Sequence, residues 1–162
     1  MVNVRSGISA ALVAAAFVAA APVAQLEARQ APRTVTLTVT DPVGEKMSYS
    51  LKQIVVKPGE KIKVRLISVA QTPKIVMAHN FVLLKAGTDI KKFTDAAANA
   101  RATDFIPPAF KSSILAQVGM VGPGESMEVV FTAPTVVGKY TFLCSFAGHY
   151  AAGMWGDLIV KK

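Results

Sequence analysis

Apolar and polar residues alternate strictly in two parts of the chain. Residues 34–40 read TVTLTVT and residues 61–68 read KIKVRLIS. This period of two predicts half-buried β-strands. Six further segments bounded by turn residues are also typical of strands, namely 47–56, 75–84, 113–118, 126–132, 139–145 and 156–161. Eight short strands at this spacing predict an all-β fold, a two-sheet antiparallel β-sandwich.

One internal segment departs from the strand pattern. Thr88 or Asp89 is placed to cap a helix running to about residue 102. We therefore interpret residues 88–112 as a short helical insertion between strands, with a long loop around Pro107 and Pro108 as the alternative. The apolar stripe of the predicted helix consists of Ile90, Phe93 and Ala97.

The N-terminal segment has the pattern of an export signal. Arg5 precedes an uncharged run, residues 7–24, that is rich in Ala and Val, as in the charged and apolar parts of a secretory signal. We predict a signal peptide at residues 1–24, cut as late as residue 28. A short tail, 25–33, and one domain, 34–162, would follow. The protein is then expected to be exported to the periplasm, the alternative being an uncleaved membrane anchor.

Composition narrows the classes of function. The chain has 162 residues with 18 Lys and Arg against 10 Asp and Glu, giving a formal charge of +8. This excess favours acidic partners. We predict no nucleic-acid binding, because the basic residues do not alternate with exposed aromatic residues. A single Cys allows neither an internal disulfide nor a CxxC metal site.

The scarce metal-binding residue types gather near the C-terminus. Cys144, His149 and Met154 are spaced as C-x4-H-x4-M between two predicted strands. The second histidine, His79, shares strand parity with the apolar residues of segment 75–84 and is expected to point inward. One thiolate, two imidazoles and a thioether form the donor set of blue copper sites. Structural zinc instead takes four strong ligands, and thioether is a poor one.

Each of these residues also has an ordinary structural interpretation. Cys144 alone would be a small buried hydrophobe, and Met154 alone would be core filler. Together, however, all Cys and His residues of the chain fall into one ligand set, which favours one copper ion per chain. No histidine remains for a second copper centre or a Cys–His nucleophilic enzyme. We therefore predict no enzymatic activity and no small-molecule substrate.

The same residues carry a resemblance to a known family. MAHNFVL at 77–83 and CSFAGHYAAGM at 144–154 resemble the first-histidine strand and the ligand loop of cupredoxins, the small blue copper proteins. The resemblance is to azurins and auracyanins, with plastocyanins more distant, and it covers residues 34–161. It implies an eight-stranded Greek-key sandwich with a helical flap. The copper ligands that it implies are His79, Cys144, His149 and Met154.

The resemblance also implies roles for neighbours of the ligands. Asn80 would tie the His79 strand to Ser145, and the backbone N–H groups of Asn80 and Phe146 would point at the Cys144 sulfur. Ala78 replaces the usual azurin Gly, and its carbonyl is a candidate for a distant axial contact. Ala147 replaces the usual azurin Pro, and the azurin cysteine pair is missing.

An uncharged surface around His149 is expected to dock redox partners. The leading hypothesis is a monomeric protein that transfers single electrons between exported or membrane-bound partners. The positive charge of the chain would favour acidic partners. The alternative is a periplasmic copper carrier or reservoir that uses the same ligands. The predicted docking patch consists of Met77, Phe146, Ala147 and Gly148.

Overall fold

The computed structural model describes residues 31–162 except 43 and 45. The predicted signal segment 1–24 lies outside the described residues, as does most of the predicted tail. Eight strands are described, which confirms the predicted strand content. They are β1 (Arg33–Val39), β2 (Gln53–Val56), β3 (Lys61–Ser68), β4 (His79–Leu84), β5 (Ile114–Val121), β6 (Ser126–Thr132), β7 (Gly138–Leu143) and β8 (Trp155–Val160).

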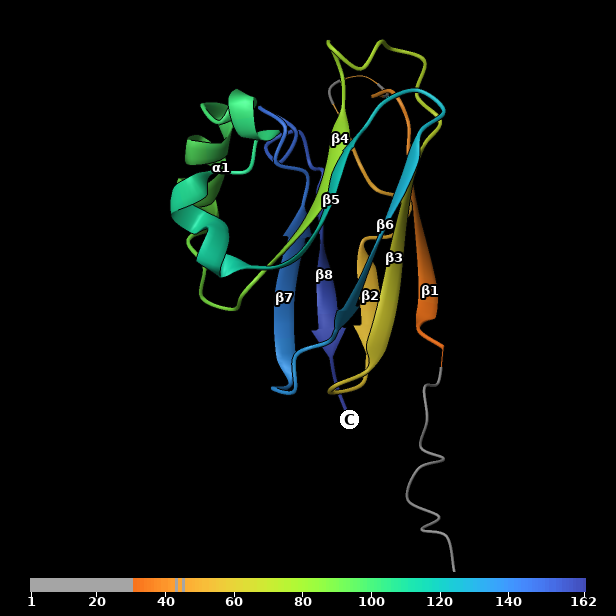
Figure 1. Ribbon diagram of the computed structural model, residues 1–162, viewed down its shortest axis with the longest axis vertical. Helices are drawn as coiled ribbons and strands as arrows, with labels where there is room; N and C mark the ends of the chain where they lie inside the picture. Colours follow the sequence, from red (N-terminus) through yellow and green to blue (C-terminus); the bar gives the residue numbers. More distant parts are fainter. Residues whose placement is uncertain (1–30, 43, 45) are drawn as a thin grey trace, which may run out of the picture. The chain divides into compact units, whose positions relative to one another are not determined.

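The strands form two sheets that pack face to face (Figure 1). One sheet has the order β1-β3-β6 and the other the order β2-β8-β7-β4-β5. The core between them contains alternate residues of β1 and β3, such as Leu37 and Leu66, packed with Phe81 and Phe142 of the larger sheet. The predicted two-sheet sandwich is therefore confirmed.

The prediction that all strands are antiparallel is wrong. β1 runs parallel to β3, and β2 runs parallel to β8. Alternation of side chains reports which face is buried and carries no information on the direction of the neighbouring strand. The remaining pairs, including β4 with β5 and with β7, are antiparallel.

The start of β4 differs from the prediction. Residues 75–78 lie outside the strand, in a turn where the N–H groups of Val76 and Met77 donate to the Pro73 carbonyl at 2.9 and 3.0 Å. Ile75 is 77% exposed, so it does not share an inward face with His79. His79 is buried because β4 is a central strand, all of whose residues are buried. β2 is likewise shorter than predicted and begins at Gln53.

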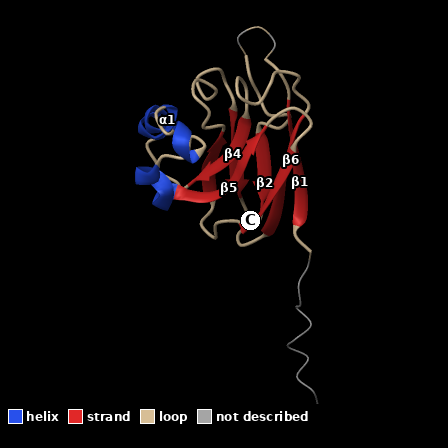
Figure 2. Ribbon diagram, turned by 45° about the horizontal axis from the view of Figure 1, so that its top comes forward, coloured by secondary structure: helices blue, strands red, loops and turns tan. Residues whose placement is uncertain are grey.

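The predicted helical insertion is present as a flap at residues 88–113, drawn in blue at the side of the sandwich (Figure 2). Helix α1 (Ile90–Ala98) begins after Asp89, whose Oδ1 accepts from the Lys92 N–H at 3.0 Å. The helix ends four residues earlier than predicted and is followed by two 3-10 helices, η2 (Arg101–Thr103) and η3 (Pro108–Ser113). None of the described helices is both long and apolar enough to cross a membrane.

Candidate metal centre

His79 is the first residue of β4. It pairs with Val121 of β5, and the register between β4 and β5 shifts between His79 and Phe81. Such a bulge bends a strand and changes the direction of a side chain, and bulges are common beside active sites. Pairing with β5 therefore holds the backbone of His79 next to a point where the strand is irregular.

The other three sulfur and nitrogen donors lie on one loop between β7 and β8. The Cys144 N–H donates to the Met154 carbonyl at 3.0 Å, which closes the base of the loop, and the Met154 N–H donates to the His149 carbonyl at 2.9 Å. Gly148 and Gly153 immediately precede His149 and Met154 and have φ of 84° and 100°. Other residues rarely adopt these angles, so the two glycines make the turns that present these ligands.

The four side chains converge on one point. The Nδ1 atom of His79 lies 3.2 Å from the Met154 Sδ, and the Nδ1 atom of His149 lies 3.4 Å from the Cys144 Sγ. One donor atom from each of His79, Cys144 and His149 falls within 4.8 Å of the others. This separation is about twice a metal–ligand distance of about 2.0–2.3 Å, so one ion can contact all three.

Burial sets the protonation states of these ligands. All four are at most 3% exposed. Removal from water lowers the pKa of both His79 and His149 to about 4, so each imidazole is neutral at pH 7 with a free lone pair. Burial raises the pKa of the Cys144 thiol to about 12. A bound cation must therefore displace the thiol proton.

The histidine on β4 fits a metal better than a hydrogen-bond partner. Among the described residues, the Nε2 atom of His79 is buried with no hydrogen-bond partner, and its Nδ1 faces only a thioether, which is a weak acceptor. Buried polar groups without partners are rare and costly. A soft ion bound between the two Nδ1 atoms and the two sulfurs would give the Nδ1 lone pair of His79 a strong partner, and Nε2 would then carry the ring proton.

Asn80 connects the strand to the loop. Its Nδ2 donates to the Ser145 Oγ at 2.7 Å, and its Oδ1 accepts from the Ser145 N–H at 2.8 Å. Both residues are buried. The backbone N–H groups of Asn80 and Phe146 donate to the Cys144 sulfur, which moderates the rise in its pKa. The contacts implied for Asn80, Ser145 and Phe146 by the resemblance are thus present.

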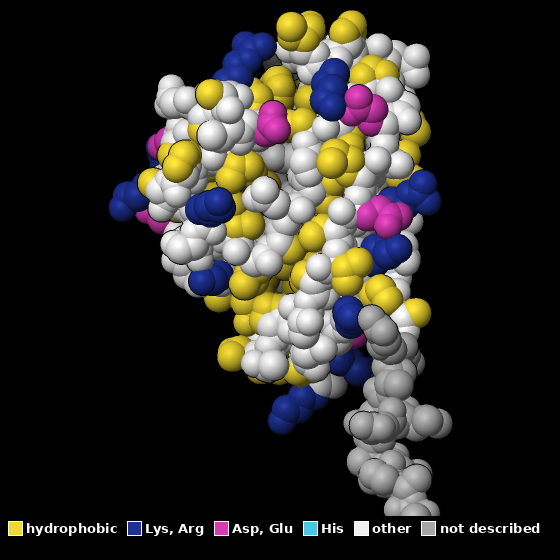
Figure 3. All heavy atoms as spheres, viewed as in Figure 1, with side chains coloured by type: hydrophobic (Ala, Val, Ile, Leu, Met, Phe, Trp, Pro, Cys, Tyr) yellow, Lys and Arg dark blue, Asp and Glu magenta, His cyan; other side chains and the backbone are white. Residues whose placement is uncertain are grey.

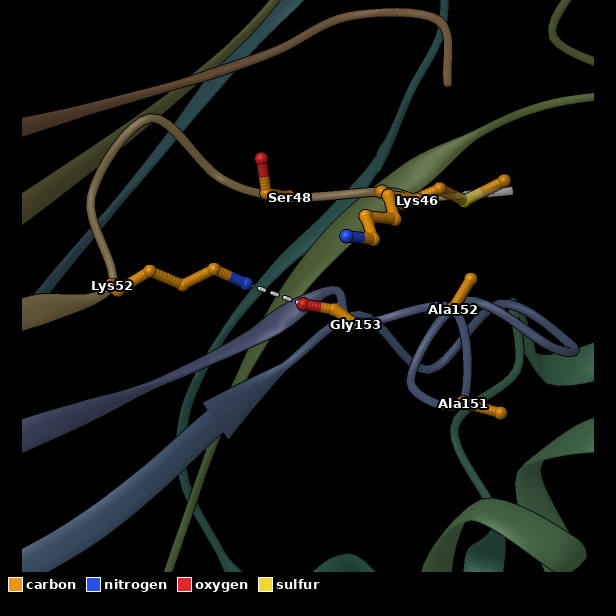
Figure 4. Close-up of a pocket in the computed structure, with 7 residues that line it drawn as sticks. Lys46, Ser48, Lys52, Ala151, Ala152 and Gly153 are labelled. Atoms are coloured by element: carbon orange, nitrogen blue, oxygen red, sulfur yellow. Dashed lines mark hydrogen bonds between the residues drawn. The ribbon is translucent and has the colours of Figure 1, made fainter. Parts of the chain in front are cut away.

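A second segment holds the other side of the loop. The Met47 N–H donates to the Ala152 carbonyl at 2.9 Å. The Lys52 Nζ donates to the Gly153 carbonyl (Figure 4) and also to the Trp155 carbonyl. A cavity of about 510 Å³ lies beside these contacts. Burial lowers the pKa of Lys52. This segment therefore restrains the backbone next to Met154.

Some contributors were missed by sequence reasoning. Tyr49 is 2% exposed, and its hydroxyl donates to the Asn80 carbonyl at 2.6 Å. Its burial and nearby Cys144 raise its pKa. No motif marked this tyrosine, because it lies outside both segments that resemble the family. Trp155, in contrast, lies at the surface with 41% exposure and stands over no ligand ring.

The chain matches the family model for copper-binding proteins of the plastocyanin/azurin family over residues 35–161. An azurin of Pseudomonas chlororaphis is 32% identical over 120 residues, 72% of this chain and 92% of that protein. Auracyanin-A of Chloroflexus aurantiacus is 30% identical over 73% of this chain and 70% of that protein. Auracyanin-B of the same organism is 41% identical, but only 35% of its length is aligned.

Solved structures agree with this result. An auracyanin from Roseiflexus castenholzii superposes with a TM-score of 0.67 and 35% identity, covering 82% of this chain and all of that one. The structure of auracyanin A, described as a "blue" copper protein, superposes with a TM-score of 0.65 and 29% identity over 79% of this chain and 99% of that one.

Proposed function

The chain belongs to the plastocyanin/azurin family of copper-binding proteins, and from this premise we propose that it is a type 1 copper protein that carries single electrons. The observation that carries the proposal is the convergence of two imidazole nitrogens, one thiol and one thioether at a buried point. This donor set matches blue copper electron-transfer sites.

Copper bound there would supply one-electron chemistry by cycling between Cu(II) and Cu(I). The chain would contribute a fixed environment. The ligands are at most 3% exposed, and the loop that holds three of them is closed by its own hydrogen bonds. A site that keeps its shape in both oxidation states needs little rearrangement when an electron arrives or leaves. Because two N–H groups stabilise the Cys144 sulfur, we expect them to raise the reduction potential.

We also propose where redox partners dock. Ala147 and Gly148 are exposed, and Met77 and Phe146 are half-buried at the same end of the molecule. Val76 adds a further 62% exposed apolar side chain in the turn before β4. Figure 3 shows apolar side chains at this upper end with a few basic and acidic side chains beside them, and no histidine on the face drawn. A patch without charge suits brief contacts, and the charge of +8 would attract acidic partners.

The remaining parts of the proposal concern context. The apolar N-terminal run supports export to the periplasm. The protein would act as a monomer and turn over no substrate. Ala78, which is buried directly before His79, would offer its carbonyl as a further, distant contact for a bound copper ion.

Copper reconstitution tests the proposal. Cu(II) added to the metal-free protein should produce an intense visible thiolate-to-copper band and reversible voltammetry. A colourless product would contradict the blue copper assignment. A coloured product with irreversible voltammetry and rapid exchange of Cu(I) would instead indicate a copper carrier with the same ligands.

A further inference from the structure

Two consecutive residues of the flap have an unusual backbone conformation. Asp104 has φ of 52° and Phe105 has φ of 59°, and they are the two non-glycine residues with positive φ in the described part of the chain. An aromatic residue rarely adopts this region, because its Cβ approaches the backbone carbonyl. Strained residues persist where the surroundings hold them, and they cluster at functional sites.

The surroundings of these residues hold the turn firmly. The Asp104 N–H donates to the Arg101 carbonyl at 3.2 Å, and the Phe105 N–H donates to the Ala100 carbonyl at 2.9 Å. This is the pairing that ends many helices, usually with glycine in the left-handed position. The Thr103 hydroxyl also donates to the Ile106 carbonyl at 2.7 Å. The position of the Phe105 ring is therefore built into the flap.

The ring of Phe105 is the outer member of a row of rings that ends at the metal centre. It packs on Phe146 with centroids 4.6 Å apart, and Phe146 packs on His149 at 4.5 Å. His149 lies 5.0 Å from His79. Phe105 and Phe146 are half-buried, whereas His149 is 3% exposed. Contacts between the two phenylalanine rings thus connect this histidine to the flap.

Helix α1 makes a looser contact with the same loop. A cavity of about 200 Å³ lies between them, lined by Thr94, Asp95 and Ala98 of the helix and by Ser145, Phe146 and Gly148 of the loop. The helix is therefore not packed tightly on Phe146. The ring of Phe105 supplies a direct aromatic contact where the helix leaves space.

We propose that Phe105 is a positioning residue for the metal centre. It holds Phe146 against the ring of His149, which fixes the orientation of this ligand and keeps water from it. The same contact steadies the Phe146 backbone, whose N–H donates to the Cys144 sulfur. This inference rests on the proposed function, and it assigns to the flap a part in setting copper retention and reduction potential.

Substitution of the ring tests the inference. In Phe105→Ala, copper transfer to a chelator should become about ten-fold faster, in line with the about 10–100-fold loss of metal affinity that follows when residues orienting metal ligands are removed. The reduction potential should fall, because water near the site favours Cu(II). Phe105→Gly removes the ring and also relieves the backbone, so it should lose copper equally fast without a loss of folding. Phe105→Tyr keeps the ring and should behave as the unchanged protein.

A matched control separates the ring row from general damage to the flap. Phe110 packs on Phe93 with ring centroids 5.6 Å apart inside the flap, against a buried cluster that also contains Leu84 and Leu143. Phe110→Ala should lower flap stability and leave copper release and potential unchanged. If Phe110→Ala and Phe105→Ala accelerate copper release equally, or if Phe105→Ala has no effect, the inference is wrong.

A measurement on the metal-free protein makes the test independent of copper chemistry. The His149 N–H donates to the Phe146 carbonyl at 3.1 Å. Its hydrogen exchange should accelerate in Phe105→Ala and not in Phe110→Ala. Unchanged exchange would overturn the inference even for a blue protein. A colourless wild-type protein would overturn the proposed function alone, because the exchange comparison would still decide the role of Phe105.

Discussion

The strand and the loop bring ligands to the metal centre in different ways. His79 is fixed by β4, a central strand that pairs with β5 and β7 and is buried throughout. Cys144, His149 and Met154 lie on a loop whose shape depends on its own hydrogen bonds and two glycines with positive φ. The strand ligand is supported by its sheet, while the loop ligands depend on the loop's own hydrogen bonds and on a few anchors from Asn80, Met47 and Lys52.

This difference indicates where the centre is sensitive to mutation. The loop needs contacts that anchor it to the strand, and Asn80 supplies two of them through Ser145. Substitutions in the loop or in this connection should weaken copper binding more than comparable substitutions elsewhere. The following predictions test that expectation, beginning with the largest effect.

The largest effect is expected from Cys144→Ser, which removes the thiolate from the loop. The visible charge-transfer band should disappear. Copper affinity should fall further than in variants of residues that only orient ligands, where the typical loss of affinity is about 10–100-fold. Optical titration with Cu(II) in competition with a chelator measures both. A variant that stays intensely coloured would show that another group supplies the colour.

Asn80→Ala should cut the connection between strand and loop. The N–H and hydroxyl of Ser145 would be left buried without partners, so we expect a loss of about 2–3 kcal/mol in the free energy of unfolding. Urea denaturation of the metal-free protein measures this loss. Asn99→Ala is the matched control, since the Asn99 side chain donates to the Asp95 carbonyl at an exposed position. An equal loss in both variants would argue against a special role for Asn80.

Gly148→Ala should strain the loop before His149. At φ of 84°, an alanine should lower the free energy of unfolding by about 1–2 kcal/mol because of backbone strain. No atom lies within 4 Å of the added Cβ, so there is no steric clash. Gly124→Ala is the control, because it has φ of 70° and similar free space in a turn outside the ligand loop. Both variants should lose similar stability, but only Gly148→Ala should alter the visible spectrum of the copper form. Identical spectra would show that loop geometry tolerates this strain.

The pH dependence of stability tests the burial of both histidines in the metal-free protein. Burial lowers the pKa of both His79 and His149 to about 4 from 6.5. The unfolded chain therefore takes up protons first, and stability should decrease as pH falls below about 6.5 towards 4. Calorimetry should show a falling Tm over this range. His149→Gln should reduce the slope, and an unchanged slope would mean that other groups dominate.

Much of the site was predictable because its chemistry is rare in this chain. One Cys and two His leave few ways to build a metal centre, and all of them lie together in the fold. The half-buried strands β1 and β3 were also predicted within one residue, since one face of each meets the core and the other does not.

Other features depend on tertiary contacts that leave no local pattern. β4 is buried on both faces, so its residues do not alternate, and its start was placed four residues too early. The parallel pairs of β1 with β3 and β2 with β8 leave no trace in periodicity. The position of Phe105 depends on a left-handed turn that contains no glycine. Sequence rules expect glycine or asparagine in such a turn, so they give no signal for it here.

X-ray absorption at the copper edge tests the central claim that the strand and the loop bring two histidines and the cysteine to one ion. In the copper-loaded protein, we predict a first shell of two nitrogen atoms and one sulfur atom, with the sulfur lost in Cys144→Ser and one nitrogen lost in His79→Ala. A shell of nitrogen and oxygen atoms without sulfur in the unchanged protein would contradict the account.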